Sequence, residues 1–319
     1  MLAACAPRGG RLGTHGPNEE LTMICARATA LACVLALLVL PGSIVAQDWD
    51  AVQIRTVSLG NGIYVLFGQG GNLGLSVGAD GAFLVDDQFA PLTEKIVAAV
   101  RSVTPEAVRF VLNTHWHGDH TGGNENMGQR GAVIVAHENV RRRMNPQEFR
   151  DLIGRSQQAP PEALPVITFS EAANFHWNGE NIRTFHVEHA HTDGDVIVHF
   201  TRANVFHMGD TFFNGSYPFV DMESGGNVNG VIAAADRVLE LANAETRIIP
   251  GHGDVAGPAE LRAYRSMVAA VRDRVQELIA QGRSEDEVVA AGVTSSFGDA
   301  WSGNAERFVR AAYQSLARR

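Results

Sequence analysis

Three histidines and one aspartate fall within six residues, directly after a segment typical of a buried strand. The segment covers residues 109–112, and the four side chains belong to His115, His117, Asp119 and His120. Core histidines usually occur singly, and a solvated loop has no reason to concentrate imidazole rings. Imidazole nitrogens and carboxylate oxygens are ligands that zinc favours. The spacing therefore predicts a metal site in which the first two histidines face one ion and the last two residues serve a second.

Two ions need more ligands than these four residues supply. Three further candidates follow later in the chain, each beside a glycine-containing loop at one end of a predicted strand: His191, Asp210 and His252. Loops at the ends of rigid elements are where sites on α/β scaffolds commonly lie. We therefore expect all seven side chains to meet.

The elements that must position these residues are short strands followed by alternating helices and strands. Residues 51–87 contain β-branched and aromatic runs separated by glycine turns. The later pattern predicts helices over 92–103 and 231–242, strands over 109–112, 132–135, 182–187, 196–200, 205–208 and 246–249, and a polar helix-and-loop insertion over 138–165. Residues 259–281, 285–291 and 304–318 are expected to be helical. This order predicts an α/β protein with two sheets packed face to face and helices outside.

Composition limits the class of partner. The chain has 319 residues, of which 45% are hydrophobic, and a formal net charge of −9. A chain of this size can bury a large core. The acidic balance argues against a nucleic-acid partner, which a basic patch normally recognises. We therefore expect a small-molecule substrate, and the sequence leaves the oligomeric state open.

The N-terminus has the layout of a secretory signal peptide. Residues 28–40 carry no charge, follow Arg27 and precede a Pro-Gly break. The run of 13 residues is too short to cross a bilayer, which needs roughly 20. Cleavage is expected after Ala46, and the start codon could be Met1 or Met23. We expect a periplasmic or secreted protein without stable membrane insertion after cleavage.

The cysteines bear on the metal site through their position. All three, Cys5, Cys25 and Cys33, lie in or before this leader. The mature chain would therefore contain no disulfide, no cysteine nucleophile and no thiolate metal ligand. Its metals would be held by histidine and aspartate alone.

Taken in chain order, these residues resemble the metallo-β-lactamase superfamily of zinc hydrolases. The run from His115 to His120 matches the His-x-His-x-Asp-His motif in full, and the similarity covers about residues 52–260. It implies a four-layer αβ/βα sandwich. In this interpretation, residues 1–46 are a leader and signal peptide, 47–258 form the hydrolase domain, and 259–319 are a helical C-terminal extension packed on the same domain.

The resemblance also implies how the ligands divide between two zinc ions. The first ion would take His115, His117 and His191, the second would take Asp119, His120 and His252, and Asp210 would bridge both.

We also expect particular roles for residues around the ligands. Asp119 would also orient the attacking oxygen, which makes it the expected catalytic residue. Asp86 matches an acidic residue that supports the ligand loop from behind. His189 matches no ligand position. Asn72 and Trp116 are candidates for the mouth of the site, although a turn residue and a packed aromatic ring are equally good interpretations.

Two ligand positions select a branch of the superfamily. One group of two-zinc β-lactamases has cysteine at the position of Asp210 and no histidine at that of His120. This chain is similar instead to the general hydrolase type, as in glyoxalase II, lactonases and RNase Z. The acidic balance and the expected export disfavour RNase Z. The absence of a basic cluster in the tail disfavours glyoxalase II, which is usually intracellular.

The loop after Asp210 bears on the substrate. The cysteine-type lactamases usually hold a substrate carboxylate with a lysine there, but residues 211–236 contain neither lysine nor arginine. Tyr217, Asn227 or Asn229 could bind a carboxylate by hydrogen bonds. The aromatic-rich stretch at 212–219 is explained equally well as core or as an apolar substrate wall.

We therefore expect an exported di-zinc metallohydrolase that cleaves an ester, lactone, thioester or amide bond with a zinc-bound hydroxide. Two alternatives stay open. One is a β-lactamase that opens the β-lactam ring. The other is an iron-dependent oxidoreductase similar to persulfide dioxygenases, which share the histidine motif. The di-iron flavoproteins of the superfamily carry glutamate at the position of His117, which argues against that class.

Overall fold

The computed structural model describes residues 47–145 and 159–317. Within them, Asp48 and everything after it belong to one compact unit. The expected leader, its cleavage point after Ala46 and part of the insertion over 138–165 lie outside the described residues. No helix in the described ranges is both long enough and apolar enough to cross a bilayer.

The first sheet has seven strands among the described residues, in the order β1-β2-β3-β4-β5-β6-β7. The first four strands pair antiparallel, and β4 to β7 pair parallel. Their bounds are β1 Arg55–Gly60, β2 Ile63–Phe67, β3 Leu73–Ser76, β4 Ala82–Val85, β5 Val108–Leu112, β6 Val133–His137 and β7 Ile167–Phe169. The helices of this half are α1 Thr93–Arg101, α2 Gly118–Thr121, α3 Asn124–Gln129 and α4 Glu138–Met144.

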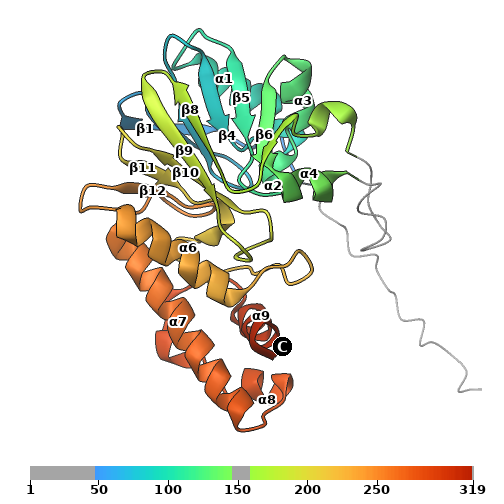
Figure 1. Cartoon of the computed structure of the whole chain (residues 1–319), viewed down its shortest axis with the longest axis vertical. Coiled ribbons are helices and arrows are strands. Elements are labelled where there is room, and N and C mark those ends of the chain that lie inside the picture. Colours follow the sequence, from blue (N-terminus) through green and yellow to red (C-terminus); the bar gives the residue numbers. More distant parts are fainter. Residues whose placement is uncertain (1–46, 146–158, 318–319) are drawn as a thin grey trace, which may run out of the picture. The chain divides into compact units, whose positions relative to one another are not determined.

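The second sheet has five strands in the described part of the chain, in the order β12-β11-β10-β9-β8. Only the β11–β12 pair is parallel. The bounds are β8 Ala172–Trp177, β9 Glu180–His186, β10 Val196–Phe200, β11 Val205–His207 and β12 Arg247–Ile249. The helices of this half are α6 Val228–Leu241, α7 Pro258–Ala280, α8 Glu285–Ala290 and α9 Ala305–Ala317, and Figure 1 shows α6, α7 and α9 side by side.

Three clusters of buried apolar side chains hold these layers together. One cluster lies between the sheets, where Phe83 and Leu112 of the first sheet meet Val198 and Ile249 of the second. A second packs α1 and α3 on the first sheet, and a third packs α6, α7 and α9 on the second. Apolar residues on both faces of each sheet require cover on both faces. The result is the sandwich that the sequence predicts, with the layers helix, sheet, sheet, helix.

Most predicted elements appear within a few residues of their expected ends, with two differences. Helix α6 begins at Val228 rather than near 231, because Asn227 caps it by accepting a hydrogen bond from the backbone N–H of Asn229. Strands β7 and β8 were not predicted. They lie at the sheet edges and expose much of their surface, so the sequence shows no buried run there.

Candidate metal centre

The candidate ligands lie on loops at strand ends. His115 and His117 follow β5, and helix α2 then carries Asp119 and His120. His191 lies in the loop between β9 and β10, Asp210 lies in a single 3₁₀ turn after β11, and His252 follows β12. The sheets thus deliver ligands from both halves of the sandwich to one place.

The first group contains His115, His117, His191 and Asp210, and its ligand atoms all lie within 4.8 Å of one another. Nε2 of His191 is 2.9 Å from Nδ1 of His117. Oδ2 of Asp210 is 3.6 Å from Nε2 of His191 and 3.9 Å from Nε2 of His115. Three imidazole nitrogens and one carboxylate oxygen suit a tetrahedral zinc site.

The second group contains Asp119, His120 and His252, also with ligand atoms within 4.8 Å of one another. Oδ1 of Asp210 faces this group, at 3.1 Å from Nε2 of His120 and 3.4 Å from Nε2 of His252. The two carboxylate oxygens of Asp210 therefore point to different groups. This is the arrangement that a bridging ligand needs.

Hydrogen bonds orient the imidazole rings. Nδ1 of His120 donates to Asp86 Oδ2 at 2.8 Å, and Nδ1 of His191 donates to the Phe219 carbonyl at 2.6 Å. Nε2 of His117 donates to Asp221 Oδ2 at 2.9 Å. Because each partner is an acceptor, a neutral ring carries its proton on the bonded nitrogen and keeps the lone pair of its other nitrogen for a metal.

Atoms of this cluster are buried without a hydrogen-bond partner. They include Nε2 of His115, Nε2 of His120 and Oδ1 of Asp210. Buried polar atoms are normally satisfied, and each exception requires an explanation. Divalent ions held by the two groups would satisfy all three atoms, so the donor set fits the metals that the sequence predicts.

The pKa values of the histidines in the cluster are shifted in opposite directions. Burial lowers the pKa of His191 to about 4 and holds that of His115 well below its usual range. These two rings are therefore neutral and able to ligate at neutral pH. For His252, burial acts the same way, but the carboxylates of Asp210 and Asp119 outweigh it and raise the pKa to about 9. The neighbouring carboxylates thus favour a positive charge at this group, which a bound metal ion would also supply.

Asp86 supports the ligand loop from behind, as the sequence suggests. Its fully buried carboxylate accepts from the backbone N–H of Thr114 at 2.7 Å and from the Thr114 hydroxyl at 2.8 Å, in addition to His120. Asp86 has a φ of 63°, which is uncommon for a residue other than glycine. In this conformation the carboxylate accepts hydrogen bonds from three donors.

Two glycines allow the ligand loops to approach each other. A Cβ at Gly71 would overlap the ring of His120, and a Cβ at Gly251 would overlap Oδ1 of Asp210. Any side chain there would displace a ligand.

Asn72 is not at the mouth of the site. It is buried, and its amide donates to the carbonyls of Pro250 and Gly253 at 2.9 and 2.8 Å. It therefore fastens the β2–β3 hairpin to the loop that carries His252. Trp116 is also absent from the lining of the cavity over the cluster, and its indole N–H donates to Ser224. His189 is exposed, belongs to neither group, and bonds the carbonyl of Gly225.

The aromatic stretch after Asp210 divides between core and site. Phe212 and Tyr217 pack into the core against Tyr264 and Phe308. Phe213 and Phe219 of the same stretch line the candidate site instead. A cavity of about 490 Å³ opens over the cluster, and its lining consists of Phe89, Phe213, Phe219, His117, Gly118, Asp119, Asp210, His252 and Arg307. The stretch therefore contributes Phe212 and Tyr217 to the core and Phe213 and Phe219 to the cavity lining, and its role as a substrate wall stays a prediction.

Sequence reasoning missed Asp221. Burial would raise its pKa, but hydrogen bonds from His117 and Ser224 hold that pKa well below its usual range. It is thus a charged partner that orients His117. An aspartate in a loop far from the histidine motif carries no sequence signal of this role.

The family follows from a comparison with known proteins. A family model described as the metallo-beta-lactamase superfamily matches residues 70–252, which include all seven candidate ligands. The chain belongs to this superfamily. Membership supports a hydrolase-type enzyme, and the His/Asp groups are consistent with the metal sites of that superfamily.

Individual superfamily members are distant from this chain. A metallo-β-lactamase type 2 of Bacillus cereus is 22% identical over 176 residues, which cover 55% of this chain and 64% of that protein, less than two thirds of its length. A metallo-β-lactamase from Pontibacter korlensis has a TM-score of 0.56 at 16% identity, covering 68% of this chain and 99% of that one. The sec-alkylsulfatase Pisa1 from Pseudomonas sp. has a TM-score of 0.65 at 16% identity, covering 83% of this chain and 50% of that one. These structures share the fold.

Proposed function

We propose that this chain is an exported metallohydrolase that binds two zinc ions and cleaves an ester, lactone, thioester or amide bond. The observation that supports it best is Asp210, whose two oxygens face separate groups of ligand atoms. Two adjacent groups with a shared carboxylate are the arrangement of two-metal hydrolytic sites.

Bound divalent ions would supply a hydroxide nucleophile at neutral pH and polarise the scissile carbonyl. The remaining work belongs to the residues of this chain. Asp119 lines the cavity and lies 3.2 Å from Nε2 of His252, so its carboxylate can accept a hydrogen bond from the attacking water and orient it. The rings of Phe213 and Phe219 line the same space and offer apolar surface to a substrate.

An iron-dependent oxidoreductase remains the competing chemistry. A mononuclear site of that kind would not require Asp210 and His252 as ligands, whereas both side chains face the cluster here. Metal analysis of the purified protein distinguishes the two. About two zinc ions per chain are expected, whereas one iron ion with oxygen consumption would overturn the proposal.

Hydrolysis is tested with a panel of lactones, thioesters and aryl esters. The names of the similar proteins add nitrocefin, a β-lactam, and a secondary alkyl sulfate to the panel. We expect turnover of at least one ester, lactone, thioester or amide, abolished by a chelator and restored by zinc. Failure to hydrolyse any member of the panel in the zinc-loaded state would contradict the proposal.

Asp119→Ala tests the role of the carboxylate. Loss of an orienting and proton-accepting group should lower kcat by about 10²- to 10⁴-fold. The control is Asp273→Ala, which removes an exposed carboxylate on α7 that pairs with Arg272. Unchanged turnover in Asp119→Ala would refute the assigned role, whereas an equal loss in the control would indicate general damage.

Export is tested separately. N-terminal sequencing of the protein recovered from the secreted or periplasmic fraction should show a chain that begins at Gln47. A mature chain that begins before Ala28 would contradict the signal peptide.

A further inference from the structure

One cation lies beside the metal cluster, although the loop after Asp210 contains none. It is Arg307, which lies far along the chain in the first turn of α9 and lines the cavity of about 490 Å³ over the cluster. No other arginine or lysine is found among the described residues that line this cavity. The C-terminal helix thus brings a positive charge to a site whose neighbouring loop lacks one.

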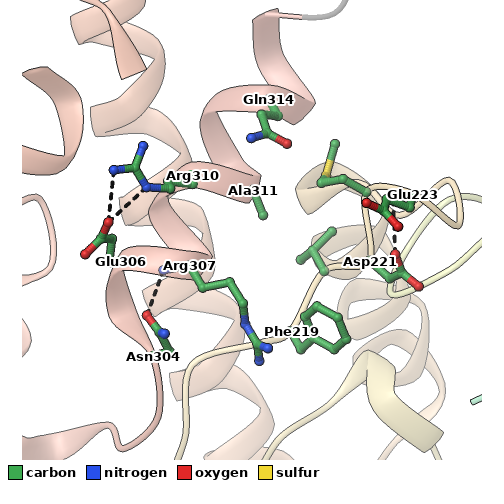
Figure 2. Close-up of a pocket in the computed structure, with 11 residues that line it drawn as sticks. Phe219, Asp221, Glu223, Asn304, Glu306, Arg307, Arg310, Ala311 and Gln314 are labelled. Carbon is green, nitrogen blue, oxygen red and sulfur yellow. Dashed lines mark hydrogen bonds and ion pairs between the residues drawn. The ribbon is translucent and has the colours of Figure 1, made fainter. Parts of the chain in front are cut away.

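Arg307 is held in place by an aromatic ring. Its guanidinium carbon lies 4.0 Å from the centre of the Phe219 ring, as the two side chains in Figure 2 illustrate. Stacking on a ring uses the flat face of the guanidinium and leaves its N–H donors, which lie in the plane, available for another partner. Phe219 in turn stacks against His117 with ring centres 5.8 Å apart, so the cation is coupled to the metal group through one side chain.

The guanidinium of Arg307 has no carboxylate partner among the described residues, whereas Arg310 does. Arg310, one turn further along α9, is held by Glu285, Asp286 and Glu306. Figure 2 shows Arg310 turned toward Glu306 and Arg307 extended toward Phe219. Two arginines of one helix face are therefore in different states, one neutralised by ion pairs and the other available.

None of the described acidic side chains near Arg307 forms an ion pair with it, and the two beside the cluster have other partners. Asp221 accepts a hydrogen bond from His117, and Asp119 pairs with His252. The polar residues that the sequence offers as carboxylate binders, Tyr217, Asn227 and Asn229, are absent from the lining of this cavity. Arg307 is thus the group best placed to bind a negative charge in the substrate.

We propose that Arg307 binds an anionic oxygen group of the substrate, a carboxylate or a sulfate, and thereby selects anionic over neutral substrates. The scissile bond would lie over the cluster, an apolar portion against Phe213 and Phe219, and the anion against the guanidinium. A planar guanidinium suits such an anion because it can donate two parallel hydrogen bonds. The position of the bond to be cleaved rests on the proposed function, whereas the anion site itself does not.

The test compares two aryl esters that differ in one charge, para-nitrophenyl butyrate and the para-nitrophenyl monoester of glutarate. Arg307→Gln should lower kcat/KM for the anionic ester by about 10- to 100-fold, the range for a lost hydrogen-bonded charge partner. The value for the neutral ester should change less than about twofold. Arg307→Lys should show an intermediate loss, because a lysine keeps the charge but not the paired donors. Arg310→Gln, which removes the same charge from the same helix, should leave the ratio of the two esters unchanged.

A binding measurement separates this inference from the proposed function. Calorimetric titration with glutarate and with methyl sulfate should show binding to the wild type and to Arg310→Gln, and at least tenfold weaker binding to Arg307→Gln. Preference between the two titrants distinguishes a carboxylate site from a sulfate site. If neither ester is hydrolysed but this pattern holds, the proposed function fails and the anion site stands. Equal binding by wild type and Arg307→Gln, or an equal loss for both esters, would refute the role of Arg307.

Discussion

The contact between Asp86 and His120 leads to a prediction about metal affinity. Asp86 accepts three hydrogen bonds, two from Thr114 and one from Nδ1 of His120. In Asp86→Asn, the remaining carbonyl oxygen can still accept from the Thr114 backbone, and the new amide can donate to the Thr114 hydroxyl. Asparagine also tolerates the positive φ of this position. Only the contact with His120 cannot be kept, because two donors would face each other.

The conflict is relieved if His120 moves its proton to Nε2. Nε2 of His120 is buried without a hydrogen-bond partner and lies 3.1 Å from Oδ1 of Asp210. A proton there would form a hydrogen bond with Asp210 and would block a metal. We therefore expect the fold to lose no more than about 1–2 kcal/mol. Metal affinity of the second group should fall by about 10- to 100-fold, as is typical when the partner of a ligating histidine is changed.

The assay is a zinc titration against a chelating dye, together with urea unfolding of the metal-free protein. Asp87→Asn is the matched control. Its side chain is as buried as that of Asp86, but its printed hydrogen bond is accepted from the backbone N–H of Gly123, which an amide oxygen can also accept, and not from a ligand histidine. The control should bind both ions normally. Wild-type affinity of both groups in Asp86→Asn, or an equal loss in Asp87→Asn, would refute the reasoning.

Three further perturbations can be predicted from the structure. Gly71→Ala would place a methyl group in the ring of His120, so it should destabilise the protein by about 1–3 kcal/mol and displace one zinc ion. Urea unfolding measures the loss of stability and metal analysis measures the loss of zinc. Full retention of zinc would contradict this prediction. Chelation should lower the melting temperature, because the ions bind only the folded chain. A loss of about 3–4 kcal/mol corresponds to about 6–16 °C for a large domain, and a melting temperature that chelator leaves unchanged would mean that the ions are not bound in the native state. The pKa of His199 is lowered to about 4, mainly by burial and also by the charge of Arg183. Between pH 6.5 and about 4 the unfolded chain therefore binds one more proton at this residue than the folded chain does. The stability of the fold falls as the pH drops through this window. His199→Phe keeps the ring stack on Phe206 and should reduce the loss between pH 7 and pH 5 by about 1 kcal/mol after allowance for solvent screening; identical pH dependence of urea unfolding in both proteins would contradict this origin.

The seven side chains that meet at the candidate metal centre could be predicted from the sequence because their chemistry is concentrated. Four ligands lie within a single loop, and the other three stand beside glycines at strand ends. The helices after Pro258 could also be predicted, since Ser284 caps α8 and the apolar periodicity is strong. Local chemistry of this kind needs no knowledge of which strands pair.

Other parts could not be predicted because their roles exist only through tertiary contact. Asp221 and Arg307 acquire theirs from His117 and Phe219, which lie far away along the chain. For Asn72, a tertiary contact changes the environment that the sequence suggests. Its position in a glycine-rich turn favours a surface role, but the turn folds onto the loop of His252 and buries the amide. Residue type and spacing do not show which loops lie against each other in the folded chain.

The order of the ligands along the chain has a consequence for how the protein matures. The first group requires His191 and Asp210, and the second also requires His252, which is reached only after most of both sheets has been synthesised. A nascent chain that ends before His191 holds only the four ligands from His115 to His120, which are divided between the two groups and complete neither. The ligand set of the first group is therefore complete in the growing chain before that of the second. A chain that crossed a membrane unfolded would acquire its ions only in the compartment where it folds.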